Sequence, residues 1–169
     1  YSCGASCKAC VRGPEDSLLI GRALGVLGEK AGIYGSIGGQ VIDVKGTEHS
    51  IPKEVLETIY ELKTSALIEA SMMIGAILGG ASEEEVKIVE KIARYVVIAF
   101  QIQEDILDGT STKEVLGKPT HSDEKNEKTT YVTLMGTAEA GRMVEELSDQ
   151  AVSLLHQLSG ENEFLEQLL

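Results

Sequence analysis

Apolar residues recur every three or four positions along most of this chain, and this spacing predicts helices. The clearest apolar stripe consists of Val89, Ile92, Val96 and Phe100. Ser82 and Glu85 match a capping box at the start of this helix, which we expect to end at Gly109. With only 3 prolines and 4% aromatic residues, the composition favours helices packed through aliphatic side chains. The predicted fold class is all-α, in a single domain spanning residues 1–169.

Helices are also expected on either side of this one. The first runs from Asp16 toward Asp43 and contains four glycines: Gly32, Gly35, Gly38 and Gly39. Because a glycine costs a helix ~1 kcal/mol relative to alanine, these glycines indicate that a backbone or a ligand approaches closely. The next spans residues 52–79, with a core-facing stripe: Leu56, Ile59, Leu67, Ala70 and Ile74. A short helix near Tyr131, a break at Gly136 and a helix over residues 138–158 complete the prediction.

Residues 109–127 are polar and contain Gly117-Lys118-Pro119, so this segment is expected to be a loop. A loop of this length is unusual in a compact domain and often works as a lid over an active site. We therefore predict an active-site lid here.

The net charge of −12 limits the partners of the chain. A negative field repels nucleic-acid phosphates and anionic lipid surfaces, so nucleic acid is not an expected partner. No stretch approaches ~20 uninterrupted apolar residues, so no membrane span is expected, and no signal peptide is recognised. A small anionic substrate would require local cations or metal ions.

The three cysteines of the chain are Cys3, Cys7 and Cys10. An odd, clustered set argues against a secreted disulfide framework and favours a reducing, cytoplasmic setting. The same spacing matches the loop that binds an iron–sulfur cluster in radical enzymes, which is one alternative function. The other interpretation is that they are small, partly buried residues at a helix end or in a loop.

An acidic cluster ends the apolar helix that precedes Gly109. Helical spacing places Glu104, Asp105 and Asp108 together, with Gln101 one turn back on the same side. Such carboxylates repel one another unless a cation neutralises them, and Mg²⁺ suits one or two carboxylates completed by water and phosphate oxygens. The alternative is a solvated acidic helix end.

Lys63 interrupts an apolar stripe, four residues after Ile59 and four before Leu67. Its ammonium group must reach an anion or water, and a bound diphosphate would supply the anion. The alternative is a lysine that extends from a packed helix to solvent. Lys118 and Lys128 could close over a diphosphate, although alone they resemble ordinary surface charges.

Five motifs in this order resemble those of trans-prenyl diphosphate synthases, the polyprenyl synthetase family that includes farnesyl and geranylgeranyl diphosphate synthases. The resemblance covers nearly the whole chain from about Ile20 onward. The motifs are Gly39-Gln40-Val41-Ile42-Asp43, Lys63-Thr64, Phe100-Gln101 followed by Glu104-Asp105-Ile106-Leu107-Asp108, Gly117-Lys118, and residues 123–131.

The resemblance implies a helical bundle around a central cavity, usually in a homodimer. It implies a Mg²⁺-dependent, short-chain prenyltransferase, of the farnesyl diphosphate type, that condenses isopentenyl diphosphate with an allylic diphosphate. Glu104, Asp105 and Asp108 would bind metal. The diphosphate would be contacted by Lys63, Lys118 and Lys128, and the reacting end would be lined by Thr64, Gln101, Gln40 and Asp43. The residues expected to act in catalysis are Lys63, Thr64, Gln101 and Asp105.

Two departures from the family pattern stand out. Glu104 replaces the aspartate that usually opens the second aspartate-rich motif, which lengthens that side chain by one methylene. Nothing in the sequence matches the first aspartate-rich motif, which belongs to the amino-terminal half of the family. The chain therefore corresponds to the carboxy-terminal half, with an incomplete bundle. The alternative is a non-catalytic or fragment subunit of such a synthase.

Overall fold

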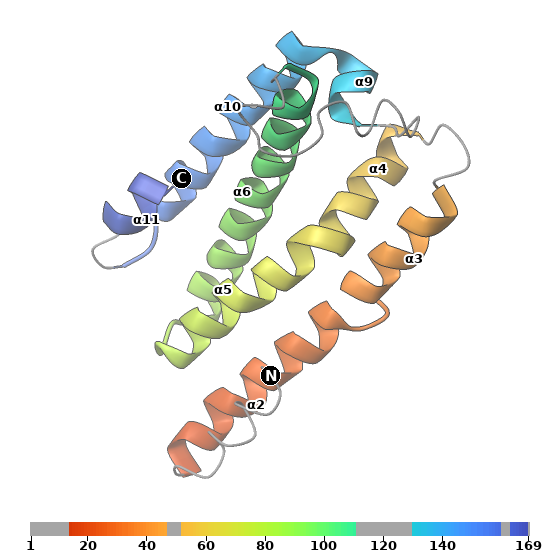
Figure 1. Ribbon diagram of the computed structural model, residues 1–169. Coiled ribbons are helices and arrows are strands. Elements are labelled where there is room, and N and C mark those ends of the chain that lie inside the picture. Colours follow the sequence, from red (N-terminus) through yellow and green to blue (C-terminus); the bar gives the residue numbers. More distant parts are fainter. Residues whose placement is uncertain (1–13, 47–51, 111–129, 160–162, 169) are drawn as a thin grey trace.

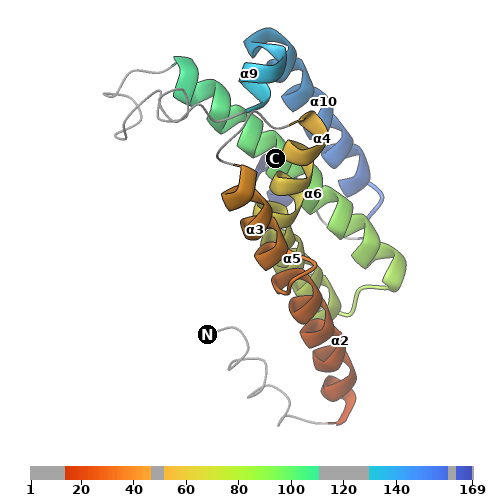
Figure 2. The same cartoon turned by 90° about the vertical axis from the view of Figure 1, so that its right-hand side faces the viewer.

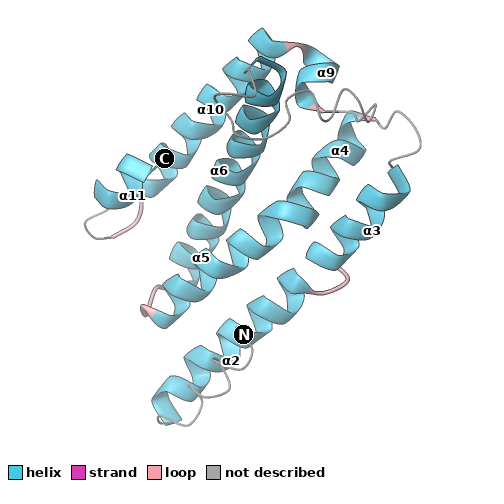
Figure 3. Ribbon diagram, viewed as in Figure 1, coloured by secondary structure: helices cyan, strands magenta, loops and turns pink. Residues whose placement is uncertain are grey.

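The computed structural model describes residues 14–46, 52–110, 130–159 and 163–168, and every regular element in these ranges is a helix (Figure 3). The elements are α2 (Pro14–Ala31), α3 (Ser36–Gly46), α4 (Lys53–Ile59), the π-helix η1 (Tyr60–Ser65), α5 (Ala66–Leu78), α6 (Glu83–Thr110), α9 (Tyr131–Met135), α10 (Thr137–Leu155) and α11 (Glu163–Leu168). The predicted all-α class is confirmed. The sequence prediction did not include α11.

The helices pack side by side. The elements α4, η1 and α5 form one continuous helical rod, and α2 packs on α5 while α3 packs on η1 (Figure 1). Helix α6 packs on α5 and η1 and also contacts α10 along its length. In the perpendicular view, α10 crosses α6 (Figure 2). No helix within the described ranges has the length and apolar character needed to cross a bilayer.

The helix boundaries follow local signals in the sequence. The predicted helix from Asp16 toward Asp43 is divided in two at residues 32–35, where Gly32 and Gly35 form a turn. The capping box of α6 is present, because Glu85 accepts hydrogen bonds from the amide and hydroxyl of Ser82 and its own amide donates to that hydroxyl. Gly136, with φ of 83°, separates α9 from α10.

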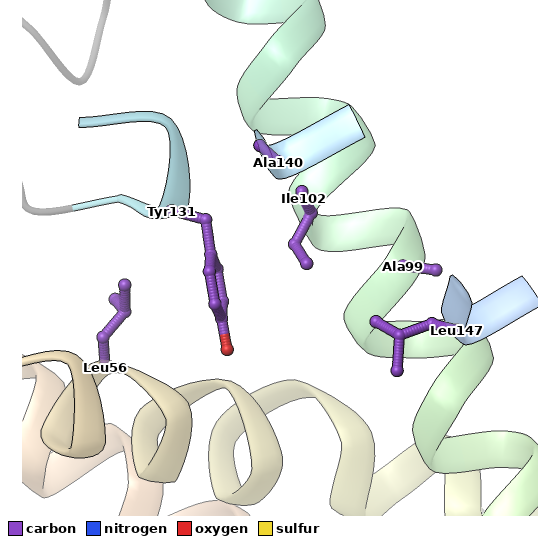
Figure 4. Close-up of a cluster of buried hydrophobic side chains, with 6 residues drawn as sticks. All are labelled: Leu56, Ala99, Ile102, Tyr131, Ala140 and Leu147. Atoms are coloured by element: carbon purple, nitrogen blue, oxygen red, sulfur yellow. The ribbon is translucent and has the colours of Figure 1, made fainter. Parts of the chain in front are cut away.

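One cluster of buried core residues joins α4, α6, α9 and α10 at one end of the molecule. Its members are Leu56, Ala99, Ile102, Tyr131, Ala140 and Leu147 (Figure 4). Of the residues predicted to face the core, Leu56, Ile59, Ala70 and Ile92 are buried. Two predictions were wrong, since Leu67 is 45% exposed and Phe100 is 59% exposed. Ala99 and Ile102, rather than Phe100, face the core from this part of α6.

Candidate active site

A π-helical segment carries Lys63 and Thr64. It spans Tyr60–Ser65, and the Ser65 hydroxyl donates a hydrogen bond to the Tyr60 carbonyl at 3.2 Å. A π-helix has more residues per turn than an α-helix, so it rotates the residues that follow it out of the preceding apolar stripe. This rotation explains why Lys63 and Leu67 do not share the buried face of Ile59.

Helix α3 lies directly against the backbone of this π-helix. A Cβ atom added at Gly39 would lie 2.3 Å from the Lys63 amide nitrogen and 2.7 Å from its Cα. The Ser36 hydroxyl donates to the Lys63 carbonyl at 3.4 Å. The close backbone approach that the glycines predicted is therefore present at Gly39.

The same approach brings Lys63 to Asp43. The Lys63 ammonium donates to Oδ2 of Asp43 at 2.6 Å, and the two side chains are 41% and 28% exposed. Lys63 thus has a carboxylate as its anion, in a position open enough for solvent to reach. The fold thus brings together Lys63, which was predicted to contact the diphosphate, and Asp43, which was predicted to line the reacting end.

The acidic end of α6 lies beside the start of the π-helix. Gln101, Glu104, Asp105 and Asp108 are all half-buried. The Tyr60 hydroxyl donates to Oδ2 of Asp105 at 2.9 Å. Within the described ranges, no three or more His, Cys, Asp or Glu side chains come together closely enough to hold a metal ion. The carboxylates still fit Mg²⁺, because this ion takes one or two protein oxygens and fills its other positions with water and phosphate oxygens.

Two tyrosines, Tyr60 and Tyr131, pack together at this end of the site, and the sequence analysis predicted this role for neither. The rings of Tyr60 and Tyr131 have centroids 5.5 Å apart and are tilted by 45°. Burial raises the pKa of Tyr131, and the nearby charges of Glu57, Glu61 and Asp105 add to this effect. The signals in the sequence were an aromatic residue three positions before Lys63 and the place of Tyr131 at the end of the motif over residues 123–131.

Of the remaining predicted site residues, Thr64 and Gln40 lie within the described ranges and the others lie outside them. Thr64 is half-buried on the π-helix, whereas Gln40 is exposed on α3 beside Ile37, Val41 and Val44. Several predictions fall outside the described residues. These are Lys118, Lys128, Cys3, Cys7, Cys10 and all of the expected lid after Thr110.

A family model named polyprenyl synthetase matches residues 29–161 of this chain. The chain belongs to the polyprenyl synthetase family. The match includes α3, the π-helix and α6, so it contains Asp43, Lys63 and the acidic cluster.

Known prenyl diphosphate synthases align with most of the chain. Geranylfarnesyl diphosphate synthase of Leucosceptrum canum is 44% identical over 133 residues, covering 77% of this chain and 36% of the relative. Farnesyl diphosphate synthase of Bacillus subtilis is 35% identical over 138 residues, covering 82% of this chain and 47% of the relative. The chain spans less than half the length of these two relatives.

Solved structures show the same fold. Geranyltransferase of Helicobacter pylori, complexed with magnesium and isoprenyl diphosphate, matches with a TM-score of 0.73 and 30% identity, over 89% of this chain and 50% of that one. A Zymomonas mobilis FPP/GFPP synthase matches with a TM-score of 0.72 and 25% identity, over 89% and 49%. The helical architecture of this chain is that of polyprenyl synthetases.

This member of the polyprenyl synthetase family also contains a buried ionic network that the sequence did not reveal. Glu69 on α5 is 2% exposed, and it pairs with Lys30 of α2 and with Nε of Arg94 on α6 at 3.1 Å. Burial opposes protonation of Lys30, but hydrogen bonds to Glu69 and Glu90 outweigh it, so the pKa of Lys30 is raised. The network ties three helices together near the π-helix.

Proposed function

We propose that the intact protein is a Mg²⁺-dependent trans-prenyltransferase that condenses isopentenyl diphosphate with an allylic diphosphate. The observation that carries the proposal is the packing of the π-helix between α3 and α6, which joins Lys63 to Asp43 and Tyr60 to Asp105. A cation-bearing segment next to an acidic helix end suits a substrate that carries a diphosphate and arrives with divalent cations.

The residues of this chain would act on the leaving diphosphate. Lys63 would exchange its contact with Asp43 for the diphosphate oxygens, and Thr64 and Gln101 would line the reacting end. Asp105 and its neighbours Glu104 and Asp108 would hold Mg²⁺, which neutralises charge on the departing group. The allylic C–O bond would break with diphosphate as the leaving group, and the double bond of isopentenyl diphosphate would form the new C–C bond. Loss of a proton from the resulting cation would then give the product.

Lys118, Lys128 and Gln40 complete the proposed substrate contacts. The lysines would bring positive charge to the diphosphate from residues 109–127 and the segment after them, the proposed lid. We propose a short-chain product of the farnesyl type. Similarity to the farnesyl diphosphate synthase of Bacillus subtilis supports this product, while other similar enzymes are named geranylgeranyl and geranylfarnesyl diphosphate synthases.

A homodimer in the cytoplasm is also part of the proposal. Exposed apolar side chains line α3 and the turn before it: Ile33, Tyr34, Ile37, Val41 and Val44. An apolar surface of this kind favours contact with another protein surface, which supports an oligomer. Light scattering on the purified intact protein would give its mass in solution. The clustered cysteines support a reducing compartment.

The test is condensation of labelled isopentenyl diphosphate with geranyl diphosphate by the intact protein. We expect product only when Mg²⁺ is present, and loss of turnover in Asp105→Ala with helicity unchanged. Asp149→Ala, an exposed carboxylate on α10, is the matched control and is expected to remain active. A turnover rate in Asp105→Ala equal to that of the wild type would overturn the proposal. Absence of turnover in the wild-type protein, restored by a complementary synthase subunit, would favour the non-catalytic alternative.

A further inference from the structure

A hydrogen bond between side chains connects the π-helix to the acidic end of α6. Its donor is the hydroxyl of Tyr60 and its acceptor is Oδ2 of Asp105, 2.9 Å away in a partly buried position. The tyrosine hydroxyl donates and the carboxylate oxygen accepts, and a hydrogen bond to a carboxylate is stronger than one between neutral groups. The bond restricts the rotation of the Asp105 carboxylate.

The ring that provides this hydroxyl is itself held in place. It packs against Tyr131 with the ring centroids 5.5 Å apart. Tyr131 is only 1% exposed, lies in the core beside Leu56 and Ile102 (Figure 4), and forms a hydrogen bond to Glu57. Movement of Tyr60 would disturb this packed cluster, so its hydroxyl has a fixed location relative to α6.

We propose that Tyr60 is a positioning residue that orients the Asp105 carboxylate for binding a divalent cation. The inference rests on the proposed function, because it takes Asp105 to be a ligand of Mg²⁺. Groups that hydrogen-bond to a metal ligand fix its orientation, and their loss typically weakens metal affinity or activity by about 10–100-fold. Tyr60 meets this description, because its hydroxyl donates to Asp105 and its ring packs against the buried Tyr131.

A purely structural role predicts a different result. If the bond only fastens the π-helix to α6, its loss would lower stability without changing how the folded protein binds cations. Tyr60→Phe separates the two roles, because it removes the hydroxyl and keeps the ring against Tyr131. Tyr95→Phe is the matched control, since Tyr95 is also a half-buried tyrosine in contact with the core.

The experiment is a titration of the intact protein with Mn²⁺ in the presence of inorganic diphosphate, followed by the electron paramagnetic resonance signal of free Mn²⁺. We expect Tyr60→Phe to weaken Mn²⁺ binding by about tenfold or more, and Tyr95→Phe to leave it unchanged. In turnover assays, the Mg²⁺ concentration for half-maximal rate should rise by a similar factor, while the rate at saturating Mg²⁺ should stay within about threefold. In an Asp105→Asn background, Tyr60→Phe should have no further effect on Mn²⁺ binding.

Each outcome decides between the two claims. Mn²⁺ affinity like that of the wild type in folded Tyr60→Phe overturns the positioning role, even if the variant unfolds at lower urea concentration. If Asp105→Asn also binds Mn²⁺ as the wild type does, then the proposed role of Asp105 fails as well. If Asp105→Asn loses binding and Tyr60→Phe does not, then only the positioning role fails.

Discussion

The ammonium nitrogen of Lys63 lies 2.6 Å from Oδ2 of Asp43, across the contact between the π-helix and α3. Lys63 was predicted to contact a diphosphate and Asp43 to line the reacting end, and in this structure they form an ion pair. Because both side chains are partly exposed, the pair should contribute no more than about 1 kcal/mol to stability. Asp43 can therefore hold Lys63 in place and release it to a more highly charged anion.

Replacing Lys63 should affect substrate binding far more than folding. We expect Lys63→Met to raise the KM for the allylic diphosphate at least tenfold, because a charge-assisted contact to the diphosphate is lost. The free energy of unfolding in urea should change by less than about 1 kcal/mol. Lys87→Met, an exposed lysine on α6, is the control. An unchanged KM in Lys63→Met would contradict this role.

Gly39 should not tolerate a methyl group. The added Cβ would meet the backbone of Lys63 at 2.3 Å, so α3 and the π-helix would have to separate. We expect Gly39→Ala to destabilise the protein by about 2–3 kcal/mol, as overpacking does. Gly75→Ala is the matched control, because nothing lies within 4 Å of that Cβ and alanine favours a helix by about 1 kcal/mol. Urea unfolding of both variants decides the point, and equal stabilities would refute the close contact.

The buried carboxylate of Glu69 should be important for stability. Glu69→Gln removes the buried counter-ion that Lys30 and Arg94 share, although Lys30 keeps Glu90 and Arg94 keeps Glu61 as partners. Breaking a fully buried pair costs about 3–5 kcal/mol, so we expect a loss above about 1 kcal/mol and below that range. Glu139→Gln removes an exposed partner of Arg142 and should change stability by less than about 1 kcal/mol. Thermal and urea unfolding of the two variants would measure the contrast, and a loss below 1 kcal/mol in Glu69→Gln would show that the network is dispensable.

The capping carboxylate of α6 should make stability depend on acid pH. Hydrogen bonds from the hydroxyl of Ser159 and from Ser82 lower the pKa of Glu85 from 4.5 to about 2. The folded state therefore binds this proton less readily than the unfolded state. The contribution of Glu85 is present above pH 4.5 and is lost as the pH falls toward about 2.

Urea unfolding across this pH range should show the difference. The gap in stability between the wild type and Glu85→Gln should be constant above about pH 5 and should shrink as the pH approaches 2. Glu84→Gln, an exposed neighbour outside the capping box, should show no such trend. A gap that does not depend on pH would mean that Glu85 titrates normally.

The sequence predicted the helices well because their signals are local. The Ser82–Glu85 capping box and the break at Gly136 depend on residues that are neighbours in the chain. Gly39 predicted a close approach, although the sequence could not say that the approaching backbone is that of Lys63. Leu67 was misplaced because a π-helix changes the register of an apolar stripe without changing its composition.

The contacts of the site were harder to predict because they join distant segments. Nothing near Tyr60 in the sequence indicates that its hydroxyl meets Asp105, 45 residues later. The sequence analysis did not single out the buried Glu69, since its partners Lys30 and Arg94 lie on other helices. The family motifs predicted roles for Lys63 and Asp105, but the residues that contact them became visible only in the packed structure.

The most direct test is calorimetric titration of the intact protein with an uncleavable thio analogue of geranyl diphosphate, with and without Mg²⁺. The wild type should bind the analogue tightly only when Mg²⁺ is present, and Asp105→Asn should lose at least tenfold in that Mg²⁺-dependent affinity. Binding that is equally tight without Mg²⁺, or unchanged in Asp105→Asn, would contradict the assignment of the α6 carboxylates to a cation-held diphosphate.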